Sequence, residues 1–152
     1  SNPASLSALR IPEKPGLHEF LSWLKEHSIK VAVATSTTRR VAEDYWKQSG
    51  IDQYINASVC GDEVINSKPD PEIFLKAASL LKVPIAACMV AEDSINGLKA
   101  ARAAGAISCM IPDLTPYTKE LFPFCDYVSP SLLACKEILL QTPEADKLKS
   151  WK

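Results

Sequence analysis

A near-continuous apolar run at residues 29–34, with the sequence Ile-Lys-Val-Ala-Val-Ala, constrains the fold more than any other feature of this chain. A strand with one face in water alternates apolar and polar residues, whereas a strand covered on both faces is apolar along most of its length. The β-branched residues of the run favour a strand over a helix. The run therefore predicts a buried strand of a parallel sheet, with helices packed on both faces.

Helical patterns alternate with short apolar runs along the rest of the chain. Asp70 and Pro71 form a strong helix start, an acidic cap followed by proline at the first helical position. Gly50 and Gly105 mark helix ends, because glycine adopts the left-handed conformation that stops a helix. Strands joined by helices form right-handed crossovers within a parallel sheet. The sequence predicts a doubly wound, three-layer parallel α/β sheet, with strands at 29–34, 55–60, 86–91, 107–111 and 126–128 and helices at 17–27, 37–49, 70–81, 94–104 and 131–140.

The composition favours one domain with no polyanionic partner. The chain has 152 residues, of which 47% are hydrophobic, enough for a single core. A net charge of −1 gives no reason to expect nucleic acid or an anionic membrane, and no apolar stretch approaches the roughly 20 residues of a membrane span. Five cysteines without a Cys-x-x-Cys spacing favour a reducing, cytoplasmic location. We expect the core at residues 15–140, between a lead-in at 1–14 and a polar tail at 141–152.

Hydroxyl side chains directly follow the first buried strand. Thr35, Ser36 and Thr37 lie where the chain turns from strand to helix. Hydroxyls and unpaired backbone N–H groups at such a turn can bind phosphate oxygens. Ser and Thr are also ordinary helix caps, so the residue types alone leave both interpretations open. We predict that these three residues bind substrate.

Lys68 lies in the segment Ser-Lys-Pro-Asp-Pro-Glu-Ile-Phe. Pro69 restricts the backbone of the lysine and Pro71 fixes the start of the next helix, so the loop is stiff. An ammonium group held in place can neutralise a phosphate, although most lysines are only solvated surface charges. We predict that Lys68 contacts the substrate and takes part in catalysis.

Glu92 and Asp93 follow the apolar run at 86–91. Adjacent carboxylates repel each other unless a cation lies beside them. Mg²⁺ is the natural candidate, since it prefers oxygen ligands and needs only one or two protein carboxylates beside water and a substrate phosphate. Alternatively, the acids only complement the positive end of the helix that follows. We predict a Mg²⁺ site at Glu92 and Asp93.

These groups all follow predicted strand ends. In parallel α/β sheets the ligand crevice lies outside the carboxyl ends of the strands, so we expect Thr35, Lys68 and Asp93 to meet at one edge of the sheet. A hydroxyl and amide cradle, a cation and a metal site are the electrostatic parts that phosphoryl transfer needs. The sequence contains no Gly-x-x-x-x-Gly-Lys phosphate loop, no dinucleotide fingerprint, no zinc spacing and no Ser-His-Asp signal that would favour another chemistry.

The motifs between about residues 15 and 140 resemble those of the haloacid dehalogenase-like phosphohydrolase superfamily, within it the β-phosphoglucomutase and phosphonatase-like branch. The resemblance rests on Val-Ala-Val-Ala-Thr-Ser-Thr, Ser-Lys-Pro-Asp-Pro-Glu-Ile-Phe and Ala-Glu-Asp-Ser-Ile-Asn-Gly. It implies a Rossmann-like core in which Thr35 bonds to the transferring phosphoryl group and Lys68 pairs with phosphate and nucleophile. It also implies that Asp93 binds Mg²⁺ directly, with Glu92 as a second ligand or as a partner behind it.

The family's first motif, Asp-x-Asp-Gly-Thr or Asp-x-Asp-Gly-Ser, does not occur in this sequence. In the family that motif ends the central strand and supplies the nucleophilic aspartate, and a substrate-selecting helical cap follows it. The resemblance therefore implies a C-terminal core portion that lacks the central first strand, with residues 1–14 as the exit segment from a missing cap. Because unpaired buried backbone is costly, we expect that the flanking strands close up, or that residues 1–11, a swapped partner chain or a separate N-terminal piece fills the slot.

The combined interpretation is the core portion of a Mg²⁺-dependent phosphohydrolase or phosphosugar mutase that acts on a small phosphorylated metabolite. The reaction would pass through an aspartyl-phosphate whose aspartate lies outside this chain, so the chain alone is expected to be inactive. The alternative is a non-catalytic phosphate-binding or assembly module of the same fold. A receiver-like signalling domain fits less well, because there the acidic pair comes first in the chain. The sequence leaves open the substrate and the choice between phosphatase and mutase.

Overall fold

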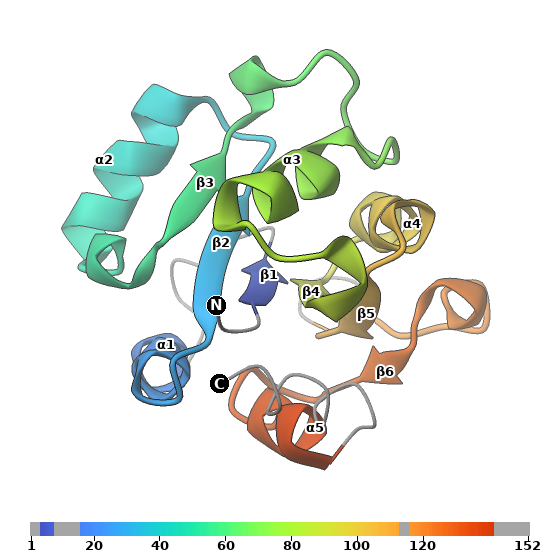
Figure 1. Ribbon diagram of the computed structural model, residues 1–152. Helices are drawn as coiled ribbons and strands as arrows, with labels where there is room; N and C mark the ends of the chain where they lie inside the picture. The colour runs from blue at the N-terminus through green and yellow to red at the C-terminus, as the bar shows by residue number, and fades with distance from the viewer. Residues whose placement is uncertain (1–3, 8–15, 113–115, 142–152) are drawn as a thin grey trace.

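The computed structural model describes residues 4–7, 16–112 and 116–141 of the chain. Its sheet has six strands in the order β3-β2-β1-β4-β5-β6 (Figure 1). All neighbouring strands are parallel, which confirms the predicted class of a parallel α/β sheet. The strands are β1 (Ala4–Ser7), β2 (Lys30–Ala34), β3 (Ala57–Val59), β4 (Cys88–Glu92), β5 (Ile107–Met110) and β6 (Tyr127–Val128).

The helices form two layers, one on each face of the sheet. Buried residues of α1, α2 and α5 share one apolar cluster with β2, β4 and β5, and buried residues of α3 and α4 share another with the opposite faces of β2 and β4. Figure 1 shows α3 and α4 on one side of the strands and α1 and α5 on the other. The helices are α1 (Leu17–Glu26), α2 (Arg39–Ser49), α3 (Glu72–Leu81), α4 (Ile95–Ala104) and α5 (Cys135–Gln141), and short 3-10 turns lie at η1 (Asp52–Tyr54), η2 (Gly61–Glu63), η3 (Ile85–Ala87) and η4 (Phe122–Phe124).

Local chemistry explains where the main helices lie and end. Helix α1 buries a stripe of four apolar side chains at helical spacing, and each fully buried side chain of this kind contributes about 1.5–3 kcal/mol. The Asp70 carboxylate accepts the backbone N–H of Glu72 at 2.9 Å, but Pro71 holds the cap position of α3, so the predicted acidic cap lies one residue before the observed one. Gly50 and Gly105 both end their helices with a positive φ, of 75° and 86°, so the two predicted stops are confirmed.

A strand occupies the centre of the sheet, which corrects the expectation that the central strand is lacking. Strand β1 pairs with β2 on one side and with β4 on the other. Of the alternatives considered for the slot, part of the lead-in, residues 4–7, is the one that fills it. The physical reason is that β2 and β4 are buried on both faces, so their backbone N–H and C=O groups need ladder partners. Residues 4–7 of the expected lead-in thus belong to the core sheet.

Some element boundaries differ from the prediction. The strand expected at 55–60 is only Ala57–Val59, and the last helix starts at Cys135 instead of residue 131. The polar tail expected at 141–152 lies outside the described residues, apart from Gln141 at the end of α5.

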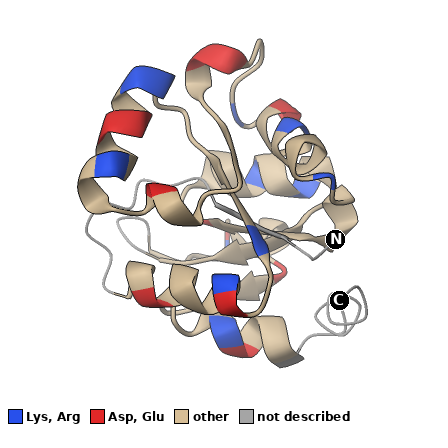
Figure 2. Cartoon of the chain, turned by 60° about the vertical axis from the view of Figure 1, so that its left-hand side comes forward, with Lys and Arg blue, Asp and Glu red and all other residues tan. Residues whose placement is uncertain are grey.

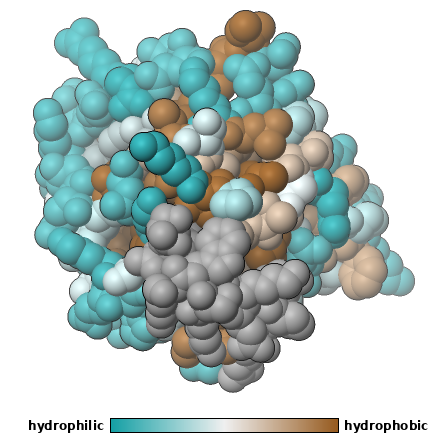
Figure 3. Space-filling model, viewed as in Figure 1, coloured by the Kyte–Doolittle hydropathy of each residue, from teal (hydrophilic) through white to brown (hydrophobic). Residues whose placement is uncertain are grey.

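The outer helices carry charged residues of both signs, and one face of the molecule has a hydrophilic rim. Lys and Arg are interspersed with Asp and Glu along the outer helices (Figure 2), and the rim of the face in Figure 3 is mainly hydrophilic, with apolar residues gathered toward its middle. Within the described ranges, no helix combines the length and apolar character needed to cross a bilayer.

Candidate active site

Thr35 lies at the carboxyl end of β2, where the chain turns toward α2. It is 5% exposed, and its backbone N–H donates to the carbonyl of Val59 at 3.0 Å. Its hydroxyl oxygen accepts the backbone N–H of Thr37 at 3.1 Å, a bond within the turn. The cap residue of α2 is Thr38, whose side chain makes no cap hydrogen bond, so Thr35 does not cap the helix. The hydroxyl also carries a proton that can be donated to a second group. Ser36 and Thr37 continue the turn and are exposed.

Lys68 reaches from the loop before α3 to the same edge of the sheet. Its ammonium group lies 3.3 Å from the carbonyl oxygen of Ala34 and 3.3 Å from Oε2 of Glu92. The ring of Phe74, which is fully buried, lies 5.1 Å from the ammonium, a geometry in which the ring face attracts a cation. The Lys68 side chain is only 10% exposed, so its charge is held at one place.

Glu92, the last residue of β4, is buried and fully hydrogen-bonded. Oε1 accepts the backbone N–H groups of Asp93 and Ser94 at 3.1 and 3.3 Å and the hydroxyl of Ser94 at 3.1 Å, while Oε2 faces Lys68. Burial raises the pKa of the Glu92 carboxyl, and the nearby Lys68 ammonium opposes that rise. A Cβ atom at Gly97 would lie 2.1 Å from the Glu92 carboxyl carbon, so only glycine leaves room for this side chain.

Asp93 differs from its neighbour because it sits half-buried at the loop between β4 and α4. Helix α4 starts beside it, with Ser94 as the cap that accepts the N–H of Gly97 at 3.0 Å. The positive end of the helix therefore lies next to two carboxylates, which is favourable.

One cleft of about 590 Å³ brings the predicted residues together at the carboxyl edge of the sheet. The spatial expectation for Thr35, Lys68 and Asp93 is thus met, whereas the chemical roles of these residues stay predictions. The cleft is lined by Thr35, Ser36, Thr37, Ser67, Lys68, Glu92, Asp93, Ser94, Ile95 and Asn96.

Four cleft residues were missed by the sequence reasoning, namely Ser67, Ser94, Ile95 and Asn96. Their adjacency to the predicted lysine and acidic pair is the signal that could have identified them, because residues in the first turn of a helix share the site at its start. Phe74 lies in the helix expected at 70–81, and no local pattern predicts its contact with a lysine.

The donor set of the cleft fits Mg²⁺ through Asp93. This ion takes one or two protein carboxylates and completes its shell with water and phosphate oxygens. Glu92 also borders the cleft, but its oxygens already accept hydrogen bonds from Asp93, Ser94 and Lys68. Among the residues that the structure describes, no group of three or more His, Cys, Asp or Glu side chains is placed to hold a metal ion.

Curated proteins with similar sequences include two bacterial relatives. A phosphorylated carbohydrates phosphatase of Thermotoga maritima is 41% identical over 95 residues, which cover 62% of this chain and 44% of the relative. Protein CbbY of Rhodobacter capsulatus is 36% identical over 126 residues, which cover 79% of this chain and 54% of the relative. The chain therefore spans about half the length of these curated relatives.

Solved structures share the fold. A putative β-phosphoglucomutase from Thermotoga maritima superposes with a TM-score of 0.76 and 34% identity, covering 83% of this chain and 61% of that chain. CbbY from Rhodobacter sphaeroides, solved in complex with phosphate, gives a TM-score of 0.71 and 30% identity over 78% of this chain and 54% of that chain. The family model for haloacid dehalogenase-like hydrolases matches residues 4–105, a range that includes the cleft. The chain belongs to the haloacid dehalogenase-like hydrolase family.

Proposed function

We propose that the cleft binds the phosphoryl group of a small phosphorylated sugar and serves a phosphatase or phosphosugar mutase. The observation that carries the proposal is the meeting of Thr35, Lys68 and Asp93 in one cleft, with the lysine held by a buried carboxylate. Relatives named as a phosphorylated carbohydrates phosphatase and a β-phosphoglucomutase support this substrate class.

Each side chain has a physical task in this proposal. The Thr35 hydroxyl and the backbone N–H of Ser36 donate hydrogen bonds to phosphate oxygens, because the N–H groups of Thr35 and Thr37 already donate to Val59 and to the Thr35 hydroxyl. Lys68 offsets the negative charge of the phosphoryl group, and its low exposure makes that charge more effective than a solvated one would be. Glu92 orients Lys68 by ion pairing, so its role is to keep the ammonium pointed at the cleft.

The metal belongs to the same proposal. Asp93 would hold Mg²⁺, and the ion would supply positive charge to the phosphate oxygens when bound. Glu92 would act behind the ion, through its ion pair with Lys68 and its hydrogen bonds from Asp93 and Ser94. In this assignment both predicted acidic residues take part in the site, Asp93 as the Mg²⁺ ligand and Glu92 as the partner of Lys68.

The nucleophile is proposed to come from outside these 152 residues. The family reaction uses an aspartate in an Asp-x-Asp motif, and this sequence contains no such motif. We therefore expect that the chain alone binds phosphate but does not turn over phosphate esters. The same absence favours the second candidate, a non-catalytic phosphate-binding or assembly module.

We also propose a reducing compartment such as the cytoplasm, because the cysteines are present as thiols and four of the five are buried.

Calorimetric titration of the chain with inorganic phosphate, with and without Mg²⁺, tests the binding site. We expect saturable binding that Mg²⁺ strengthens, and loss of the Mg²⁺ effect in Asp93→Asn. The matched control is Asp44→Asn, which removes an exposed carboxylate on α2. Absence of binding by the unmodified chain would contradict the proposal.

A second experiment separates the two candidate functions. Phosphate release from a panel of sugar phosphates is measured with a protein in which an Asp-x-Asp segment precedes these residues. Turnover supports the enzyme, whereas phosphate binding without turnover supports the non-catalytic module.

A further inference from the structure

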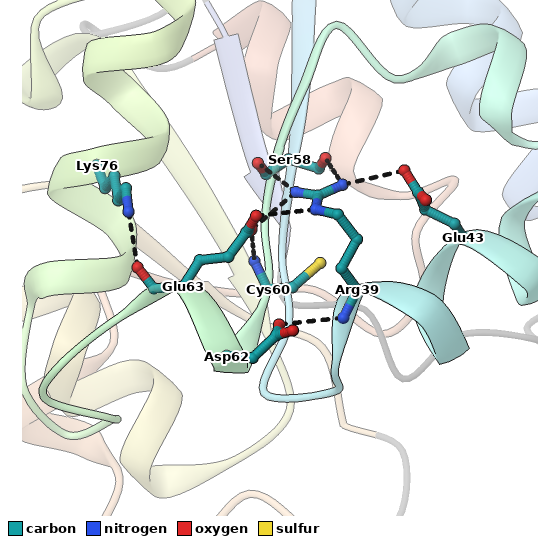
Figure 4. Close-up of polar contacts among 7 residues, drawn as sticks. All are labelled: Arg39, Glu43, Ser58, Cys60, Asp62, Glu63 and Lys76. Atoms are coloured by element: carbon teal, nitrogen blue, oxygen red, sulfur yellow. Dashed lines mark hydrogen bonds and ion pairs between the residues drawn. The ribbon is translucent and has the colours of Figure 1, made fainter.

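Arg39 is the first residue of α2, and every N–H group of its guanidinium donates to an acceptor (Figure 4). Nε and Nη2 donate to the two carboxylate oxygens of Glu63 at 2.9 and 2.8 Å. Nη1 donates to the hydroxyl of Ser58 at 3.1 Å and to Glu43 at 3.3 Å, and Nη2 also donates to the carbonyl of Ser58 at 3.1 Å. A guanidinium has five N–H donors in a planar fork, so these five contacts fix its orientation.

Glu63, the partner of this fork, is itself tied to the backbone. Its Oε1 accepts the N–H of Cys60 at 2.8 Å, and its carbonyl accepts the ammonium of Lys76 at 2.6 Å. Hydrogen bonds from Arg39 are the main cause that lowers the pKa of the Glu63 carboxyl to about 2. The Arg39 and Glu63 side chains are 31% and 34% exposed, so solvent screening limits what the pair adds to stability. Its chief consequence is geometric.

The backbone around this pair holds the turn at residues 35–38 against residues 59–63. The N–H of Gly61 donates to the carbonyl of Thr37 at 2.9 Å, and the N–H of Arg39 donates to Asp62 at 3.1 Å. The approach is close, since a Cβ atom at Gly61 would lie 2.1 Å from the carbonyl oxygen of Ser36. The two hydrogen bonds between Arg39 and Glu63 add a further link between the start of α2 and the end of η2.

We propose that Arg39 is a positioning residue for the phosphate-binding turn, an inference that rests on the function proposed above. In the part of the chain that the structure describes, Arg39 is not among the residues that line the cleft. It acts through residues 35–37 of the turn, which line the cleft and whose hydroxyl groups would meet the phosphate. By tying the start of α2 to Ser58 and Glu63, the guanidinium fixes those donors before the anion arrives. Donors fixed in advance bind more tightly than donors that must be ordered on binding.

The test compares Arg39→Met with Arg40→Met by calorimetric titration with inorganic phosphate and Mg²⁺. Arg40 is the exposed neighbour, so both variants lose the same charge. We expect roughly tenfold weaker phosphate binding in Arg39→Met, because small misplacements of binding groups are costly, and unchanged binding in Arg40→Met. Arg39→Lys should not restore binding, since an ammonium cannot reproduce the fork.

Amide hydrogen exchange without ligand gives a second readout of the same proposal. Exchange at residues 35–38 should become at least about tenfold faster in Arg39→Met, while amides of β4 and β5 stay protected. If Arg39→Met does not fold, as judged by circular dichroism, Glu63→Gln takes its place in both measurements.

The outcomes separate the two proposals. If the unmodified chain fails to bind phosphate, the proposed function is wrong, and the exchange data still decide whether Arg39 orders the turn. If the unmodified chain binds and Arg39→Met binds equally well, the positioning role is overturned. Equal weakening in Arg40→Met, or full recovery in Arg39→Lys, would also overturn it.

Discussion

Replacing Lys68 by methionine should destabilise the protein in a pH-dependent way. Methionine keeps much of the length of the side chain and packs well against an aromatic ring such as Phe74, but it removes the charge that faces Glu92 at 3.3 Å. Because the Glu92 side chain is 3% exposed, water cannot take over the role of the lost ammonium.

The expected loss follows from the burial of the pair. Removing one partner of a buried ion pair costs about 3–5 kcal/mol when the other stays ionised. Three hydrogen bonds to Oε1 of Glu92 remain in this variant and still stabilise the carboxylate, so the loss should lie near the lower end of that range. We expect the free energy of unfolding to fall by about 3 kcal/mol at pH 8. As the pH falls, protonation of Glu92 relieves the uncompensated charge, so the loss should shrink toward about 1 kcal/mol for the lost hydrogen bonds of Lys68.

The direction of the pH dependence follows from the raised pKa of Glu92. In the pH range between its unfolded and folded pKa values, the folded state holds a proton that the unfolded state releases. This contribution to stability is complete below the unfolded pKa and is lost as the pH rises through the folded pKa. Loss of Lys68 removes a cause that lowers the pKa of Glu92, so the folded-state pKa rises further and the pH range between the two pKa values becomes wider.

Urea denaturation of the Lys68→Met variant at pH 5 and pH 8, followed by tryptophan fluorescence, measures the effect. The control is the double variant Lys68→Met with Glu92→Gln, whose stability relative to the unmodified chain should change little between the two pH values. The reasoning is refuted if the single variant loses the same free energy of unfolding at both pH values, or if the double variant is as unstable as the single one at pH 8.

Three further outcomes are expected. Gly97→Ala should lower the free energy of unfolding in urea, despite a gain in helix propensity of about 1 kcal/mol, because the new Cβ overlaps the buried Glu92 carboxyl; a more stable variant would contradict this contact. Gly61→Ala should cost at least about 2 kcal/mol in the same assay and weaken phosphate binding in calorimetry, because its Cβ meets the carbonyl oxygen of Ser36. The pKa of Glu63 is lowered to about 2, so its charged form stabilises the fold above the unfolded pKa, and this contribution is lost as the pH falls through 2. After solvent screening the contribution is about 1 kcal/mol. Acid titration of Glu63→Gln should therefore show a smaller loss of stability than the unmodified chain.

Much of the site could be predicted because its residues follow strand ends. Any residue directly after a buried strand of a parallel sheet lies at the carboxyl edge, so the positions of Thr35 and Asp93 follow from local patterns. Lys68 was located by the prolines of its loop, which restrict the local backbone. Arg39 and Glu63 were not predicted, because each is an ordinary surface residue type and their pairing joins segments far apart in the sequence.

Local patterns determined the alternation of strands and helices, the glycine stops and the edge at which the functional groups gather, since these depend on spacing between near neighbours. Only the tertiary structure decided that residues 4–7 form the central strand, that Glu92 faces Lys68 while Asp93 lines the cleft, and that Arg39 ties the turn to Glu63. The physical reason is that these features depend on burial, on competition for hydrogen-bond partners and on contacts between distant segments, none of which leaves a periodic trace in the chain.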